Sequence, residues 1–210
     1  MLFVLVSYLP VPGNLGEMKT KPTQTAARLL NSAGIQADFV LARAPVAIDE
    51  PRRRKLAIFC NVQPENVISA PDVESIYEVP LNFAWEKLDD KILAKLNLKS
   101  NKKDLKEWSK MVQTARTAKK QLKVGVVGKY FTTGDFILSD AYVSVIEAMR
   151  HAAWHANRQP VLEWIDSLAY EKNPKKLAEL KDFDGIIVPG GFGGRGIEGK
   201  ISAIKYVREH

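Results

Sequence analysis

Short apolar runs alternate with segments of helical periodicity along most of the chain, and this alternation is the strongest constraint on its fold. Several runs, such as "LKVGVVGKY", are apolar almost throughout, as expected of strands buried on both faces of a parallel sheet. We expect strands at residues 3–10, 37–43, 66–71, 122–130, 160–166 and 185–191. We expect helices at residues 23–34, 49–62, 81–98, 174–182 and 198–210, and a further helix with Leu138, Tyr142, Val145, Met149 and Ala153 on one face and Ser139 or Asp140 as its cap. Strands and helices joined by short loops form parallel βαβ units, so the sequence predicts an α/β protein made of two doubly wound parallel-sheet halves.

A basic segment lies between the two halves. Residues 99–123 hold nine Lys/Arg and two Asp/Glu, whereas the other residues hold 22 of each sign, so the whole net charge of +7 lies in this segment. Aromatic residues do not alternate with these cations, which favours a solvated tether over a nucleic-acid-binding surface. We therefore expect domains at residues 1–98 and 122–210, a linker at 99–121, and no nucleic-acid partner.

The composition favours a cytoplasmic protein. A single cysteine, Cys60, excludes an intramolecular disulfide and fits a reducing compartment. No apolar run approaches the ~20 residues that cross a bilayer. The apolar start "MLFVLVSYLP" lacks a basic region and a cleavage site, so it indicates a buried strand and not a signal peptide. Apolar neighbours and the lack of an adjacent base make Cys60 a small core residue.

The segment "DGIIVPGGFGGRGIEGK" places five glycines directly behind an apolar strand. Gly191 to Gly196 form a literal G-x-G-x-x-G, which fits a dinucleotide-binding turn if an acid follows on the next strand. Alternatively, the adjacent backbone N–H groups of Gly190 and Gly191 stabilise the oxyanion of a tetrahedral intermediate. Residue spacing alone leaves both readings open.

The segment "MKTKPTQTAARLL" combines cations with a helix start. Pro22 suits the first helical turn, with Thr20 or Thr23 as the cap, so an ordinary capped helix is the simplest explanation. Lys19 and Lys21 oppose the helix dipole, however, unless an anion such as a triphosphate lies there.

Three other clusters favour structural roles. The run Arg52 to Lys55 is typical of a solvated helix face, although a phosphate contact is possible from its place after a strand. Asp72, Glu74 and Glu78 fit a polar loop better than a magnesium site. His151 and His155 have the i, i+4 spacing of zinc ligands, but without a third ligand they are expected to be structural histidines.

Six runs, taken together, closely resemble the CTP synthase family of glutamine-dependent ligases. In order, they are "GEMKTKPTQ", "FCNV", "VISAPDVESIYEVP", "VGKY", "SDAYVSVIEAMRHA" and "DGIIVPGGFGGRGIEGKISAIKYVRE". The resemblance implies an internal segment of such a ligase. It would comprise the C-terminal part of a P-loop-type amidoligase domain and an incomplete class I glutamine amidotransferase domain. Members of the family use ATP and Mg²⁺ to activate UTP and aminate it to CTP with ammonia from glutamine, in pyrimidine nucleotide biosynthesis.

The resemblance also implies residue roles. It assigns UTP and feedback-inhibitor CTP binding to Lys19, Thr20, Lys21, Pro22, Thr23, Gln24 and Lys55. It assigns ATP binding to Arg43, Pro71, Asp72 and Val73, and glutamine and oxyanion binding to Gly190 and Gly191. Tyr130 matches a tyrosine that gates the ammonia passage, although the loop "KYFTTGDFILSDAY" is longer than is common in the family.

The resemblance places the nucleophilic cysteine and its His and Glu partners beyond His210, and no phosphate loop or magnesium carboxylates match. We therefore expect no catalytic residue here and an inactive isolated chain. The alternative is a truncated protein that binds UTP or CTP, or synthase subunits, without turnover. Implied partners are UTP, CTP, ATP, glutamine, GTP as a candidate activator, and copies of itself in a tetramer; no membrane partner is implied.

Overall fold

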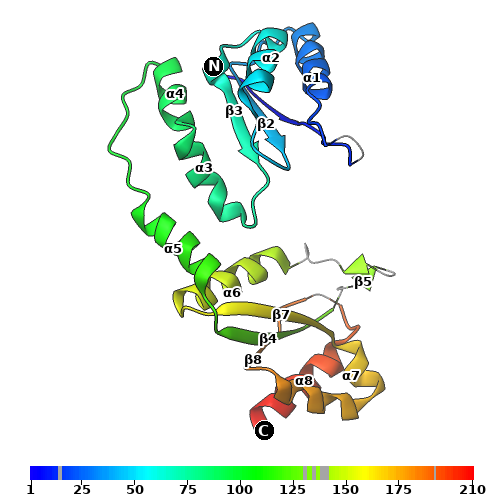
Figure 1. Ribbon diagram of the computed structural model, residues 1–210. Coiled ribbons are helices and arrows are strands. Elements are labelled where there is room, and N and C mark those ends of the chain that lie inside the picture. Colours follow the sequence, from blue (N-terminus) through cyan, green and yellow to red (C-terminus); the bar gives the residue numbers. More distant parts are fainter. Residues whose placement is uncertain (14–15, 130–131, 134–135, 138–141, 192) are drawn as a thin grey trace. The chain divides into compact units, whose positions relative to one another are not determined.

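The computed structural model describes residues 1–13, 16–129, 132–133, 136–137, 142–191 and 193–210 (Figure 1). The chain forms two compact units, Met1–Lys106 and Glu107–His210, which are described separately. No helix among the described residues is both long and apolar enough to span a membrane.

The first unit is a three-stranded parallel sheet with helices on both faces. Its elements are β1 (Val4–Tyr8), α1 (Lys21–Ser32), β2 (Phe39–Ala44), α2 (Glu50–Cys60), β3 (Val67–Pro71), α3 (Val79–Trp85) and α4 (Leu88–Lys95), with short 3₁₀ turns at Pro64–Asn66 and Ile76–Glu78. The strand order is β1-β2-β3, with Val4 opposite Phe39 and Val40 opposite Val67. Parallel register brings the carboxyl ends of all three strands to one edge.

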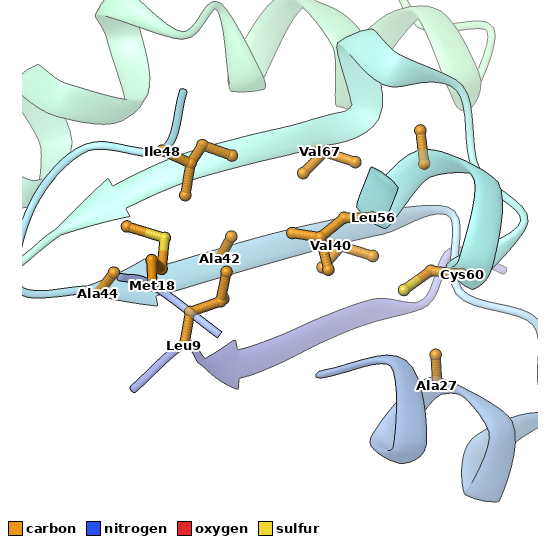
Figure 2. Close-up of a cluster of buried hydrophobic side chains, with 11 residues drawn as sticks. Leu9, Met18, Ala27, Val40, Ala42, Ala44, Ile48, Leu56, Cys60 and Val67 are labelled. Atoms are coloured by element: carbon orange, nitrogen blue, oxygen red, sulfur yellow. The ribbon is translucent and has the colours of Figure 1, made fainter. Parts of the chain in front are cut away.

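Alternate residues of the central strand β2 contribute side chains to two separate hydrophobic cores, one on each face of the sheet. Val40, Ala42 and Ala44 pack with residues of α1 and α2, including Ala27, Leu56 and Cys60 (Figure 2). Phe39 packs on the other face with Ile68 and Leu88. A strand buried on both faces needs apolar residues at successive positions, which is why "DFVLA" shows no period of two. The doubly wound α/β prediction is confirmed for this unit.

The prediction of one continuous helix at residues 81–98 is wrong. The chain forms two helices, because Lys87 takes a left-handed conformation with φ 54° and begins α4 as its N-cap. No glycine or proline marks this break in "AWEKLDD", so the periodic apolar pattern continues across it. The helix at 49–62 is confirmed as α2, where the Asp49 side chain accepts a hydrogen bond from Arg52 N at 3.0 Å.

The second unit also has a parallel sheet, in the order β7-β4-β8. Its elements are α5 (Lys106–Thr117), β4 (Gln121–Gly128), α6 (Val143–His155), β7 (Gln159–Asp166), α7 (Leu168–Lys172), a 3₁₀ helix (Pro174–Asp182), β8 (Gly185–Ile187) and α8 (Ile197–Glu209), with a short antiparallel pair at Thr132–Thr133 and Phe136–Ile137. Val126 and Val127 are fully buried on opposite faces of β4 and belong to two different cores. The parallel α/β prediction is confirmed here as well.

Three details of this unit differ from the sequence prediction. Residues 106–117, expected within a linker, form α5, which buries Val112 and leaves its charged side chains outside. The segment 174–182 is 3₁₀ and not α-helical. The helix after β4 is confirmed, but its predicted caps Ser139 and Asp140 lie outside the described residues; its N-cap is Tyr142.

Two glycines allow α8 to approach the turn after β7. A Cβ atom on Gly199 would lie 1.9 Å from the backbone oxygen of Ser167, and one on Gly196 would lie 2.5 Å from Ser167 Oγ. Gly196 also has φ 75°, a conformation that other residues rarely adopt. Gly196, the last glycine of the motif, and Gly199 on α8 are therefore both needed for close packing of the chain on itself.

We predict that Gly199→Ala destabilises the second unit by about 1–3 kcal/mol, because its methyl group overlaps the Ser167 backbone. Intrinsic helix propensity alone would predict about 1 kcal/mol of stabilisation. The sign of the change in the free energy of unfolding therefore distinguishes steric overlap from helix propensity. Urea unfolding followed by tryptophan fluorescence measures the change. Gly185→Ala, whose added Cβ would meet nothing within 4 Å, is the matched control. A stabilised Gly199→Ala variant would contradict the close approach.

Candidate functional sites

The carboxyl edge of the first sheet continues the strand pairing into the loops. Leu9 N donates to Arg43 O at 2.7 Å, and Asp72 N donates to Ala44 O at 2.8 Å. These bonds hold the loops after β1, β2 and β3 side by side. Ligands of open parallel sheets bind at this edge.

The start of α1 lies at this edge and is pinned there by Thr23. Its fully buried hydroxyl is 2.9 Å from Ser7 Oγ on β1. Thr20 occupies the N-cap position, but its hydroxyl accepts from Gln24 Nε2 at 3.0 Å and does not cap the helix. The prediction that Thr20 or Thr23 caps α1 through its side chain is therefore wrong, because other side chains occupy both hydroxyls. Lys21 and Pro22 are exposed beside this uncapped end.

Several cations surround the α1 start. Lys19 Nζ lies 2.6 Å from Glu17 Oε2, and this contact is the main cause of the lowered pKa of Glu17. The charges of Arg52 and Lys55 lower the same pKa further, so both lie close enough to act on Glu17. Glu17 therefore lies within the electrostatic influence of Lys19, Arg52 and Lys55.

The run Arg52 to Lys55 is only partly a solvated face, and that prediction needs correction. Arg53 donates to Val67 O and pairs with Glu86 at 2.9 Å, with both side chains mostly buried. Arg52 Nε donates to Met18 O at 3.1 Å. A helix that packs on a sheet buries one side of any such run, so these two arginines have structural bonds while Arg54 and Lys55 remain exposed.

A pocket of about 500 Å³ gathers the four residues assigned to ATP. Arg43, Pro71, Asp72 and Val73 all line it, together with apolar side chains including Val6, Leu41 and Phe83. Arg43 Nη2 lies 2.9 Å from Asp72 Oδ1 at the exposed mouth. An apolar floor below charged groups suits a flat aromatic base. Asn82, which sequence reasoning missed, also lines the pocket and donates to Ser69 O at 3.0 Å.

In the second unit, the glycine turn follows β8 and exposes Gly190 and Gly191. Their N–H groups make no hydrogen bond to any described residue. Two lysines, only 2% and 8% exposed, lie beneath the turn: Lys129 Nζ donates to Gly193 O, and Lys200 Nζ donates to Pro189 O at 2.7 Å. Sequence reasoning missed both lysines, since nothing in the sequence shows that they are buried.

One contact at the start of α8 counts against the dinucleotide interpretation of this turn. The packing of Gly196 against Ser167 does not distinguish the two interpretations, because the third glycine of a dinucleotide-binding turn also serves close packing. At the start of α8, Gly199 N donates to Glu171 Oε1 at 3.2 Å, and a carboxylate of the chain itself therefore occupies the place of a phosphate. The N–H groups of Gly190 and Gly191, which have no partner among the described residues, are therefore the hydrogen-bond donors that this turn offers to a ligand.

The other predicted candidates have the following positions. Cys60 is 1% exposed in the first core, and burial raises the pKa of its thiol, so the prediction of a core cysteine is confirmed. Tyr130 lies outside the described residues. His151 and His155 line a pocket between α5 and α6 together with Glu107. Within the described part of the chain, no group of three His, Cys, Asp or Glu residues is placed to hold a metal ion.

Family models match both units. The model described as CTP synthase N-terminus matches residues 1–98, and the one described as Glutamine amidotransferase class-I matches residues 137–210. Together the two models describe a protein in which a synthetase-type α/β unit precedes a class I glutamine amidotransferase unit. Along the whole chain the relatives are CTP synthases, and the chain belongs to the CTP synthase family.

Relatives from three organisms illustrate the similarity. The chain is 44% identical over 211 residues to CTP synthase of Caldanaerobacter subterraneus subsp. tengcongensis and 43% identical over 210 residues to that of Carboxydothermus hydrogenoformans, matching 100% of this chain and 38% of either relative. It is 45% identical over 206 residues to CTP synthase of Sulfurisphaera tokodaii, matching 98% of this chain and 37% of the relative. The chain thus spans less than two fifths of the relatives' length.

We predict that Lys200 titrates at lower pH in the folded chain than in urea. Burial lowers its pKa, and the positive charge of Lys129 lowers it further. Between the two pKa values the unfolded chain holds more protons, so the free energy of unfolding rises with pH across that window. NMR titration of the lysine side chain measures both values. Lys129→Met should raise the folded pKa; a folded pKa at or above that in urea would contradict the buried position.

Proposed function

We propose that the chain is part of an ATP-dependent ligase of the cytoplasm that aminates UTP to CTP with ammonia from glutamine, in pyrimidine nucleotide synthesis. The observation that carries this proposal is the joint position of two assigned residue sets at one sheet edge. The α1 start with Lys19 and Lys21 lies at the same edge as the pocket of Arg43 and Asp72. Family membership supports the chemistry.

In this proposal the α1 start binds the triphosphate of UTP, or of CTP as feedback inhibitor. Lys19, Lys21 and Lys55 supply positive charge, and the uncapped first turn supplies N–H groups. Charge-assisted hydrogen bonds of this kind are the stronger ones in proteins. Glu17 pairs with Lys19 in the free chain, so nucleotide binding would replace the Glu17 carboxylate by a phosphate as the partner of Lys19.

ATP occupies the neighbouring pocket in this proposal, with its base on the apolar floor and Arg43 at the mouth. Its phosphates would point along the carboxyl edge towards UTP. We propose that Mg²⁺ accompanies ATP, and because the described residues offer no ligand set for it, no step assigned to this chain runs through the metal.

The second unit would bind glutamine at its glycine turn. The N–H groups of Gly190 and Gly191, which bond to no described residue, would donate hydrogen bonds to the carbonyl oxygen as negative charge develops on it during attack by a thiolate. We further propose a tetrameric assembly of the complete enzyme, with GTP as an activator.

We predict that the chain binds UTP in titration calorimetry and that Lys21→Met weakens binding about tenfold, or about 1.4 kcal/mol. The variant removes one phosphate-facing charge from an exposed position, so it should not affect folding. Lys102→Met, an exposed lysine in the basic segment, is the matched control and should bind as the parent chain does.

No saturable heat with UTP or CTP would contradict the proposed nucleotide site. Equal weakening by Lys102→Met would mean that UTP binds through net charge alone. Tight binding of UTP together with co-purifying synthase subunits would instead favour the second candidate function, a binding protein without turnover.

We also predict that the 210-residue chain alone releases no ammonia from glutamine. Its one cysteine is buried, and its thiol has a raised pKa, whereas glutamine hydrolysis of this type needs an accessible thiolate. A coupled glutamate assay measures the activity. Ammonia release that disappears in Cys60→Ala would contradict this account of the nucleophile.

A further inference from the structure

Both ends of the glycine turn are held from below by buried ammonium groups. Lys200, on α8, donates to the carbonyl of Pro189 at 2.7 Å, and Lys129, directly after β4, donates to the carbonyl of Gly193. Each lysine carries its charge into the unit, where only 8% and 2% of the side chains remain exposed. Burying an ammonium group costs free energy unless it is well hydrogen-bonded. A buried lysine is therefore an unfavourable choice where packing alone is needed, which suggests that these two lysines have a specific role.

Peptide geometry shows what the contact with Pro189 does. The carbonyl of Pro189 and the N–H of Gly190 belong to one peptide group, which is planar and trans, so they point in opposite directions. When Lys200 holds the carbonyl inward, the Gly190 N–H must point outward. Glycine has a freely accessible range of backbone angles, so without such a bond this peptide could rotate.

Lys129 acts on the rest of the turn in two ways. Its bond to the Gly193 carbonyl orients the N–H of Gly194 by the same geometry. Its side chain also supports Gly191, because a Cβ atom there would lie 3.2 Å from Lys129 Cε and 3.6 Å from Lys200 Nζ. Gly191 is therefore packed directly on the two lysines, and a side chain at this position would have to displace Lys129 by a few tenths of an ångström.

We propose that Lys200 and Lys129 are positioning residues of the glycine turn: Lys200 fixes the outward N–H of Gly190 as an oxyanion donor, and Lys129 supports the backbone of Gly191 from below and fixes the far end of the turn. This inference rests on the proposed glutamine-binding role of that turn. The lysines act through the Pro189–Gly190 and Gly193–Gly194 peptide groups and not by contact with the substrate. Their buried positive charge also favours a negative charge on the outer side of the turn, because little solvent separates the two.

NMR of the 210-residue chain tests the inference without catalysis. Residual dipolar couplings report the direction of the Gly190 N–H bond, and the order parameter reports its mobility. In the parent chain we expect a single orientation of the Gly190 N–H bond and an order parameter of about 0.85, the value of rigid backbone. In Lys200→Met we expect the value at Gly190 to fall below about 0.6, the range of flexible segments.

Three controls separate positioning from general destabilisation. Lys200→Arg keeps a donor and a charge, so it should restore the parent orientation. Lys205→Met, at an exposed position of the same helix, should leave Gly190 unchanged. The N–H couplings of Val126, fully buried in β4, show whether the unit stays folded in every variant. If Lys200→Met unfolds the unit, the comparison of Lys200→Arg with the parent chain decides.

An unchanged Gly190 coupling and order parameter in Lys200→Met would overturn the inference, as would a folded Lys200→Arg variant in which Gly190 is mobile. Neither result would affect the proposed function, since UTP binding by the first unit is measured independently. Conversely, failure of UTP binding with an immobilised turn would contradict the proposed function and leave the positioning role standing.

Discussion

Parallel hydrogen bonding between neighbouring strands is the constraint on which both units depend. In the first unit, β2 pairs with β1 and β3 in parallel, so every loop that carries an assigned ligand residue emerges at one edge. In the second, β4 pairs with β7 and β8, which brings Lys129 to the level of the glycine turn. Antiparallel pairing of any of these strands would separate the groups that each site combines. Strand direction therefore brings the residues of each site together, and side-chain chemistry then determines what each site can bind.

The two sites use backbone N–H groups in different ways. At the α1 start, a proline and two occupied threonine hydroxyls leave the helix end uncapped and surrounded by lysines. At the glycine turn, buried lysines bond to the carbonyls and leave the N–H groups of Gly190 and Gly191 exposed. In both, no side chain among the described residues bonds to the N–H groups at the site. Such an arrangement is suited to anions: phosphate oxygens in the first unit and a developing oxyanion in the second.

Much of this could be predicted from the sequence, and the failures have physical reasons. Near-continuous apolar runs predicted the positions of the strands, and β2 and β3 are buried on both faces as such runs imply. The prediction that the apolar start of the chain is a buried strand is wrong for one face of β1, because Val4, Val6 and Tyr8 are exposed there. The break at Lys87 was invisible, since a non-glycine residue in a left-handed conformation leaves no mark on the apolar pattern. The burial of Lys129, Lys200 and Arg53 could not be foreseen either, because a charged residue is normally exposed and only tertiary contacts show otherwise. Asn82 was missed for the same reason, as its partner Ser69 is distant in sequence.

Mapping of ligand contacts by NMR tests the central claim most directly. In a uniformly labelled chain, UTP should shift the amide signals of Lys19, Thr20, Lys21, Thr23, Gln24 and Lys55, and ATP should shift those of Arg43, Asp72 and Val73. The account predicts two separate footprints that are occupied together when both nucleotides are added. Shifts confined to the basic segment 99–121, or a single footprint for which the two nucleotides compete, would contradict it.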